Sequence, residues 1–131
     1  WAITQNKPEN ETDNLTHWLR KNKRNNKSTH FPKETKNAKK AILTYKILKE
    51  LDNYFLLEVS MKSGRHHQIR CQLQAIGCPI KGDIKYGSKR TNKDGSIDLH
   101  ARNVKFMHPV SKKQIDITAP LRDQKIWQNC V

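Results

Sequence analysis

The chain has 131 residues, of which 26 are lysine or arginine and 12 are aspartate or glutamate, so its formal net charge is +14. This length suits one domain, and its core must be modest because only 34% of the residues are hydrophobic. No run approaches the roughly 20 apolar residues of a membrane span, and no signal peptide is visible, so a cytoplasmic protein without a membrane partner is expected. A strong positive charge attracts polyanions, which favours a nucleic acid as the partner.

The three cysteines are Cys71, Cys78 and Cys130. Their odd number and wide spacing predict free thiols rather than disulfides. Zinc ligands usually come in closer pairs, so no metal site is expected.

The first part of the chain is polar. Residues 1–5 have the pattern of a strand, whereas residues 6–40 predict a polar, basic loop region with few apolar positions. Within it, residues 20–27 hold five positive charges and no acid, which indicates a solvated segment.

A hairpin and a helix follow. Apolar and polar residues alternate over 41–47 and again over 55–61, which predicts two strands joined by a turn at residues 51–53. Ile69, Leu73 and Ile76 then fall on one stripe of a helix that ends at Gly77.

Glycine and lysine dominate residues 80–97, which predicts a loop. Residues 99–107 and 114–119 predict a second hairpin, in which Ile115 and Ile117 supply the buried face, and residues 121–128 predict a short helix. The expected class is α+β, a mostly antiparallel or mixed sheet with a few helices.

No hydrolase, P-loop or dinucleotide motif is present. The informative segments, in chain order, read S-G-R-H-H-Q-I-R at 63–70, I-G-C-P-I-K-G-D at 76–83, Y-G at 86–87, L-H-A at 99–101 and F-M-H-P at 106–109. Together they resemble the RluA-type pseudouridine synthases, which carry G-R-x-H-Q-I-R, G-x-P-I-x-G-D-x-x-Y-G, L-H-A and H-P in this order.

The resemblance implies that residues 1–131 are the C-terminal part of one pseudouridine synthase catalytic domain, with a motif-bearing core at 41–120. Members of the family isomerise uridine to pseudouridine in RNA, here ribosomal or transfer RNA, without metal or organic cofactor. By position, Arg70 matches the active-site arginine that pairs with the catalytic aspartate, and Leu99 matches the apolar residue that packs on the target base.

The expected contacts to RNA are also assigned by position. They are Arg65, His66, His67, Lys81, Lys85, Lys89 and Arg90. A structural interpretation stays open for several residues: His66 and His67 as the start of the helix, Tyr86 and Gly87 as a turn, His100 and His108 as structural histidines, and Trp18 and Trp127 as packing residues.

One part of the family pattern is missing. The family places its catalytic aspartate in an H-R-L-D segment, which these residues lack, and its essential tyrosine would fall just before Trp1. Neither Asp83 nor Asp98 is assigned that role, so the chain alone is expected to be inactive.

An exposed sheet edge is expected to favour self-association. A non-catalytic RNA-binding module and a basic ribosome-associated structural protein are the alternatives.

Overall fold

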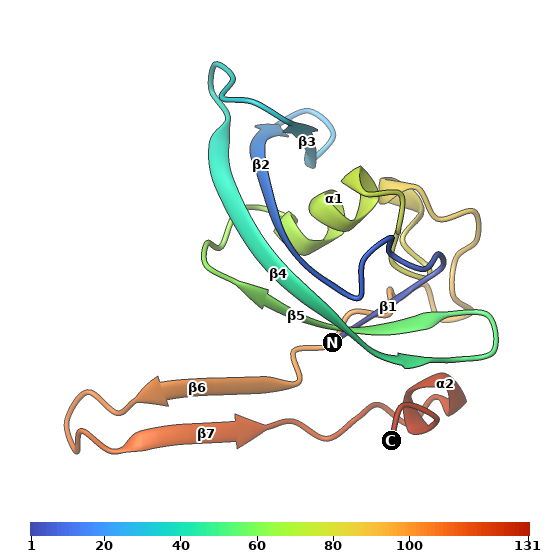
Figure 1. Cartoon of the computed structure of the whole chain (residues 1–131), viewed down its shortest axis with the longest axis vertical. Helices are drawn as coiled ribbons and strands as arrows, with labels where there is room; N and C mark the ends of the chain where they lie inside the picture. Colours follow the sequence, from blue (N-terminus) through green and yellow to red (C-terminus); the bar gives the residue numbers. More distant parts are fainter.

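A curved five-stranded antiparallel sheet holds one helix against its concave face (Figure 1). The computed structural model describes all residues 1–131. The strand order is β1-β5-β4-β2-β3, which confirms the α+β class. The strands are β1 (Ala2–Thr4), β2 (Thr12–Asn22), β3 (Lys27–Phe31), β4 (Lys39–Glu50) and β5 (Phe55–Met61).

The predicted hairpin is present as β4 and β5. Its register runs from Leu43 opposite Met61 to Glu50 opposite Phe55. Leu43 and Tyr45 point inward and are buried, as the alternation of apolar residues requires. β5 has the predicted bounds, whereas β4 continues past 41–47 at both ends, because its backbone pairing persists into the polar residues that flank the apolar run.

The expectation of a loop over residues 6–40 is wrong. Residues 12–22 form β2, which pairs with β4 and with β3, so the basic segment at 20–27 is largely the tip of a hairpin. Only Leu15 and Leu19 of β2 are buried; Trp18 is half-buried, and the other residues of the strand are polar. Two buried residues four apart fit one face of a strand or of a helix equally well, so they predict neither, and the backbone ladder with β4 defines this strand.

The predicted helix is α1 (Gln68–Ala75). It places Leu73 in the main core and ends at Gly77, whose φ of 76° is readily adopted only by glycine. The next segment is a loop, as expected, apart from one turn of 3₁₀ helix, η1 (Ile84–Tyr86).

The C-terminal hairpin stands apart from the main sheet. It consists of β6 (Asn103–Met107) and β7 (Gln114–Thr118), and Figure 1 shows it extending below the curved sheet. The prediction of a buried face is wrong, because Ile117 is 52% exposed. A two-stranded ribbon without a covering layer leaves both faces open. The final helix is only α2 (Lys125–Gln128).

Loop residues cover the outer edge of β1. The backbone N–H of Lys81 donates to the Ile3 carbonyl at 2.8 Å, and that of Ile3 donates to the Asp98 carbonyl at 3.0 Å. The neighbouring β5 pairs with β1 only through residues 55–57. Residues 58–61 therefore keep one strand edge open, which is where the expected self-association would start.

All three cysteines are unpaired and buried, as predicted. Trp127 is fully buried, which confirms its packing role. None of the helices has both the length and the apolar character needed to cross a membrane.

Candidate active site

A cleft of about 750 Å³ separates the open edge of β5 from the segment that leads into β6. Part of its lining is apolar and part is charged, with both signs present. The lining includes Trp1, Val59, Ile69, Leu99, His100 and Arg102. Such a mixture of apolar walls and a few polar groups is typical of a ligand-binding cleft.

Leu99 is held in this cleft by its backbone neighbours. Leu99 forms an isolated antiparallel β-bridge with Ala2. The next residue, His100, exchanges two backbone hydrogen bonds with Trp1, of 2.8 and 2.7 Å. The Leu99 side chain is half-buried and packs against the main core. It therefore has a supported side and a side that faces the cleft.

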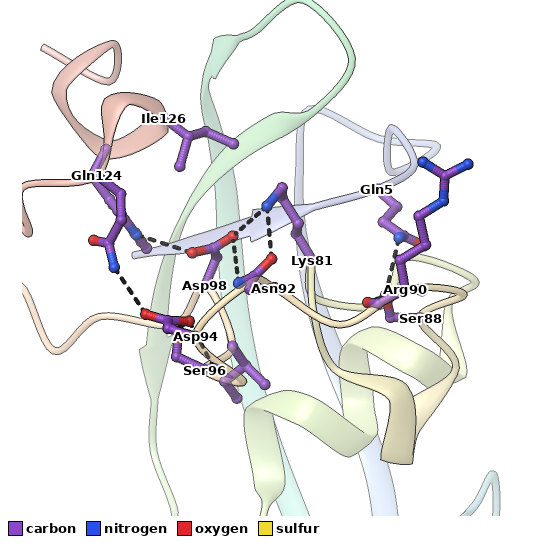
Figure 2. A network of polar contacts seen from close by, with 12 residues as sticks. Gln5, Lys81, Ser88, Arg90, Asn92, Asp94, Ser96, Asp98, Gln124 and Ile126 are labelled. Atoms are coloured by element: carbon purple, nitrogen blue, oxygen red, sulfur yellow. Dashed lines mark hydrogen bonds and ion pairs between the residues drawn. The ribbon is translucent and has the colours of Figure 1, made fainter.

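A buried carboxylate fixes the residue just before Leu99 (Figure 2). Asp98 is 3% exposed and accepts hydrogen bonds from Asn92 Nδ2 at 3.2 Å and Trp127 Nε1 at 3.1 Å. It also forms ion pairs with Lys81 and Arg122, both at 3.2 Å. Asp98 thus ties the loop and the C-terminal segment to the strand that carries Leu99.

The same network engages Lys81, which was expected to contact RNA. Its ammonium group bonds Asn92 Oδ1 at 2.7 Å as well as Asp98. The neighbouring Gly82 has a φ of +88°, and a Cβ there would lie 2.8 Å from the Ser96 carbonyl oxygen. Glycine is therefore required at position 82 of the motif, because the loop is too crowded for a side chain there.

Arg70 is engaged inside the chain and does not line the cleft. Its Nε and Nη2 each donate to one oxygen of Asp83, both at 2.8 Å. Its guanidinium also lies 4.9 Å from the centre of the Tyr86 ring. The hydrogen bond with Asp83, which is 1% exposed, raises the pKa of Arg70. Residue spacing alone did not reveal Asp83 as its partner.

His67 has both ring nitrogens occupied. Nε2 lies 3.2 Å from Arg70 Nη1, and Nδ1 lies 2.8 Å from Tyr86 Oη. Because a guanidinium only donates, Nε2 must accept, so the proton of the neutral ring is on Nδ1 and is donated to Tyr86. Burial, followed by the charge of Arg70, lowers the pKa of His67 to about 4.

Ser28 joins the β2–β3 hairpin to the start of α1. Its hydroxyl lies 3.0 Å from His66 Nδ1 and donates to the His66 carbonyl at 2.8 Å. Its backbone N–H donates to Tyr86 Oη at 2.8 Å. The buried Tyr86 thus has a structural role. Ser28 was missed because nothing in a K-S-T-H sequence marks a tertiary contact.

The other expected RNA contacts lie on the surface. Arg65 is exposed, and its Nε donates to the Lys40 carbonyl at 3.0 Å. Lys85 is exposed, and Lys89 and Arg90 line a separate cleft of about 560 Å³. The residues assigned by position are therefore spread over several faces. No group of three or more His, Cys, Asp or Glu could hold a metal ion.

The comparisons with known proteins agree on one family. The family model for RNA pseudouridylate synthase matches residues 1–75. A ribosomal large subunit pseudouridine synthase C from Rickettsia felis is 37% identical over 124 residues, which are 92% of this chain and 40% of that protein. An uncharacterized RNA pseudouridine synthase, YlyB, from Bacillus subtilis is 34% identical over 87 residues, 66% of this chain and 29% of that protein.

The solved structure of human RNA pseudouridylate synthase domain containing 1 has the same fold. It superposes with a TM-score of 0.75 at 19% identity, covering 98% of this chain and 56% of that one. The chain spans about 40% of the length of the Rickettsia relative. With the family model matching more than half of its residues, the chain belongs to the RNA pseudouridylate synthase family.

Proposed function

We propose that the protein containing these residues isomerises uridine to pseudouridine in RNA, and that the cleft beside Leu99 receives the target base. The observation that carries this proposal is the position of Leu99. The L-H-A motif places it on the wall of a cleft of about 750 Å³, with a rigid backbone behind it. A base removed from its stack needs such an apolar surface to replace the contacts it loses.

Ribosomal RNA is the proposed substrate class. The names of the Rickettsia and Vibrio cholerae relatives specify the large ribosomal subunit. The net charge of +14 is consistent with an RNA partner but does not distinguish one RNA class from another. Transfer RNA and a cytoplasmic location stay predictions.

The two arginines of the G-R-H-H-Q-I-R motif have different surroundings. Arg70 already pairs with Asp83, so a second carboxylate would have to share its guanidinium. Arg65 is exposed, and no carboxylate contacts it. We therefore propose that Arg70 acts mainly by holding the start of α1, and that Arg65 is the better placed to meet a substrate phosphate or a carboxylate from elsewhere in the protein.

Release of tritium from C5-labelled uridine in ribosomal RNA tests this function. The assay requires the product of the complete reading frame, compared with Arg65→Ala, Arg70→Ala and, as a control, Lys113→Ala in the exposed turn between β6 and β7. Release by the unaltered protein supports the isomerase. If Arg70→Ala remains folded and loses more tritium release than Arg65→Ala, Arg70 acts directly in the active site.

A non-catalytic RNA-binding module is the second candidate. An H-R-L-D segment elsewhere in the complete reading frame would favour the isomerase, and its absence from the complete reading frame would favour this module. RNA binding without tritium release by the complete product would support this candidate over the isomerase.

A further inference from the structure

A second cleft is lined by residues that take no part in the candidate active site. It has a volume of about 640 Å³ and is formed where the β2–β3 hairpin, the start of β4 and the β5–α1 connection meet. Its charged lining residues are all positive: Arg20, Lys21, Lys23, Lys39 and Arg65. His66 is its remaining titratable residue.

No ion pair neutralises these five cations. None of them takes part in any of the salt bridges of the structure, whose carboxylates are Glu50, Asp83, Asp98 and Asp116. Arg20 donates only to the Lys36 carbonyl at 3.3 Å and lies 4.7 Å from the centre of the Phe31 ring. Like charges gathered around a concave surface concentrate the field and attract an anion.

The shape of the cleft is fixed by buried contacts. Leu19 and Ser28, which line it, are 4% and 2% exposed. Through His66, Ser28 also fastens the hairpin to the segment that carries Arg65. The cationic side chains therefore extend from a backbone that these buried contacts hold in place.

The two clefts are connected through one short segment. Met61 lines the candidate active site, whereas Gly64 and Arg65 line the basic cleft. At most about 10 Å of chain separates Met61 from Gly64, so an RNA strand whose target base entered the first cleft would bring its neighbouring phosphates towards the second. Lysine and arginine without base-edge partners contact the phosphates and leave the sequence unread.

We propose that this basic cleft binds the sugar-phosphate backbone of RNA next to the target nucleotide. The choice of RNA as the polyanion rests on the proposed function, whereas the anion site itself rests on the geometry. The hairpin tip at residues 20–27 thereby gains a role as one wall of the RNA-binding surface.

The test is the affinity of the 131-residue chain for a fluorescein-labelled single-stranded ribosomal RNA fragment, measured by anisotropy over a range of KCl concentrations. The triple variant Lys21→Gln/Lys23→Gln/Lys39→Gln removes three charges from the cleft. The control Lys112→Gln/Lys113→Gln/Lys125→Gln removes three from exposed positions that line none of the described clefts. Circular dichroism checks that both variants fold.

We expect the cleft variant to bind RNA on the order of tenfold more weakly. The slope of the logarithm of the binding constant against the logarithm of the KCl concentration should fall in magnitude by about two, and both quantities should change much less in the control. Equal losses in the two variants would mean that only net charge matters and would overturn the proposal, as would no loss in either. Tritium release by the complete product tests the isomerase proposal independently of RNA affinity. If tritium is released but the two variants lose the same affinity, the basic cleft is rejected as an RNA site and the isomerase proposal stands.

Discussion

Arg70 and Asp83 form a two-point ion pair between the helix and the glycine-rich loop that follows it. Both hydrogen bonds measure 2.8 Å, and the side chains of Arg70 and Asp83 are 19% and 1% exposed. The pair joins the G-R-H-H-Q-I-R motif to the G-D-I-K-Y-G motif. Two segments that the family resemblance treats separately are therefore one structural unit, which also includes His67 and Tyr86.

Asp83→Asn tests the strength of this unit. The change leaves a mostly buried guanidinium without its counter-charge, so we expect the free energy of unfolding to fall by about 3 kcal/mol. Urea denaturation of the 131-residue chain measures it. The matched control is Glu50→Gln, which removes the exposed pair with Lys7 and should change the free energy by under about 1 kcal/mol. If the free energy of unfolding fell equally in both variants, the Arg70–Asp83 pair would contribute no more to stability than an exposed ion pair.

Tyr86→Phe removes the hydroxyl that joins β3 to α1. The buried N–H of Ser28 would lose its acceptor and His67 Nδ1–H would lose its partner, so we expect a loss of about 1–3 kcal/mol. Tyr54→Phe is the control, because no hydrogen bond of the Tyr54 hydroxyl is present in the structure. The same denaturation curves measure both variants, and an unchanged midpoint for Tyr86→Phe would contradict the role given to the hydroxyl.

Regularly spaced apolar residues predicted β4, β5 and α1, and Ile115 and Ile117 predicted the C-terminal hairpin even though both of its faces are open. The existence and type of β4, β5 and α1 are confirmed. These elements contribute to one core cluster, which includes Leu43, Tyr45, Leu57 and Leu73. β2 has only Leu15 and Leu19 to bury, and its partners are distant in sequence, so its polar residues predict a loop. Similarly, the motif located Leu99, but the partner of Arg70 depends on how the loop folds back on the helix.

Acid should destabilise the protein partly through His67. Its pKa is about 4 in the folded chain, against an ordinary value of 6.5, so the unfolded chain binds the proton more readily between these values. The stabilisation is complete above about pH 6.5 and is lost as the pH falls towards 4. The melting temperature of His67→Gln should therefore depend less on pH than that of the unaltered chain. His108→Asn is the control, and a pH dependence equal in both variants would exclude His67 as a contributor.

The three thiols should react slowly in the folded chain. Burial raises the pKa of Cys71 to about 11 and also raises those of Cys78 and Cys130, which keeps the thiolate form rare. Iodoacetamide at pH 8 followed by mass spectrometry should find little modification without urea and three modified sites in urea. Because Cys130 is 7% exposed, it should react first in the folded chain. Rapid labelling of Cys71 would contradict its buried position.

Asp98→Asn should loosen the residue that the proposed function places beside the base. Asparagine keeps the shape and one acceptor oxygen but removes the charge that pairs with Lys81 and Arg122. The backbone hydrogen bonds on either side of Leu99 depend on this anchor, so the His100 amide should exchange with deuterium faster than in the unaltered chain. Asp94→Asn, which alters an exposed carboxylate of the same loop, is the control. If exchange at His100 accelerates only with Asp98→Asn, the carboxylate positions Leu99; if it is unchanged, the strand pairing with Trp1 and Ala2 is sufficient and the network around Asp98 serves only the C-terminal segment.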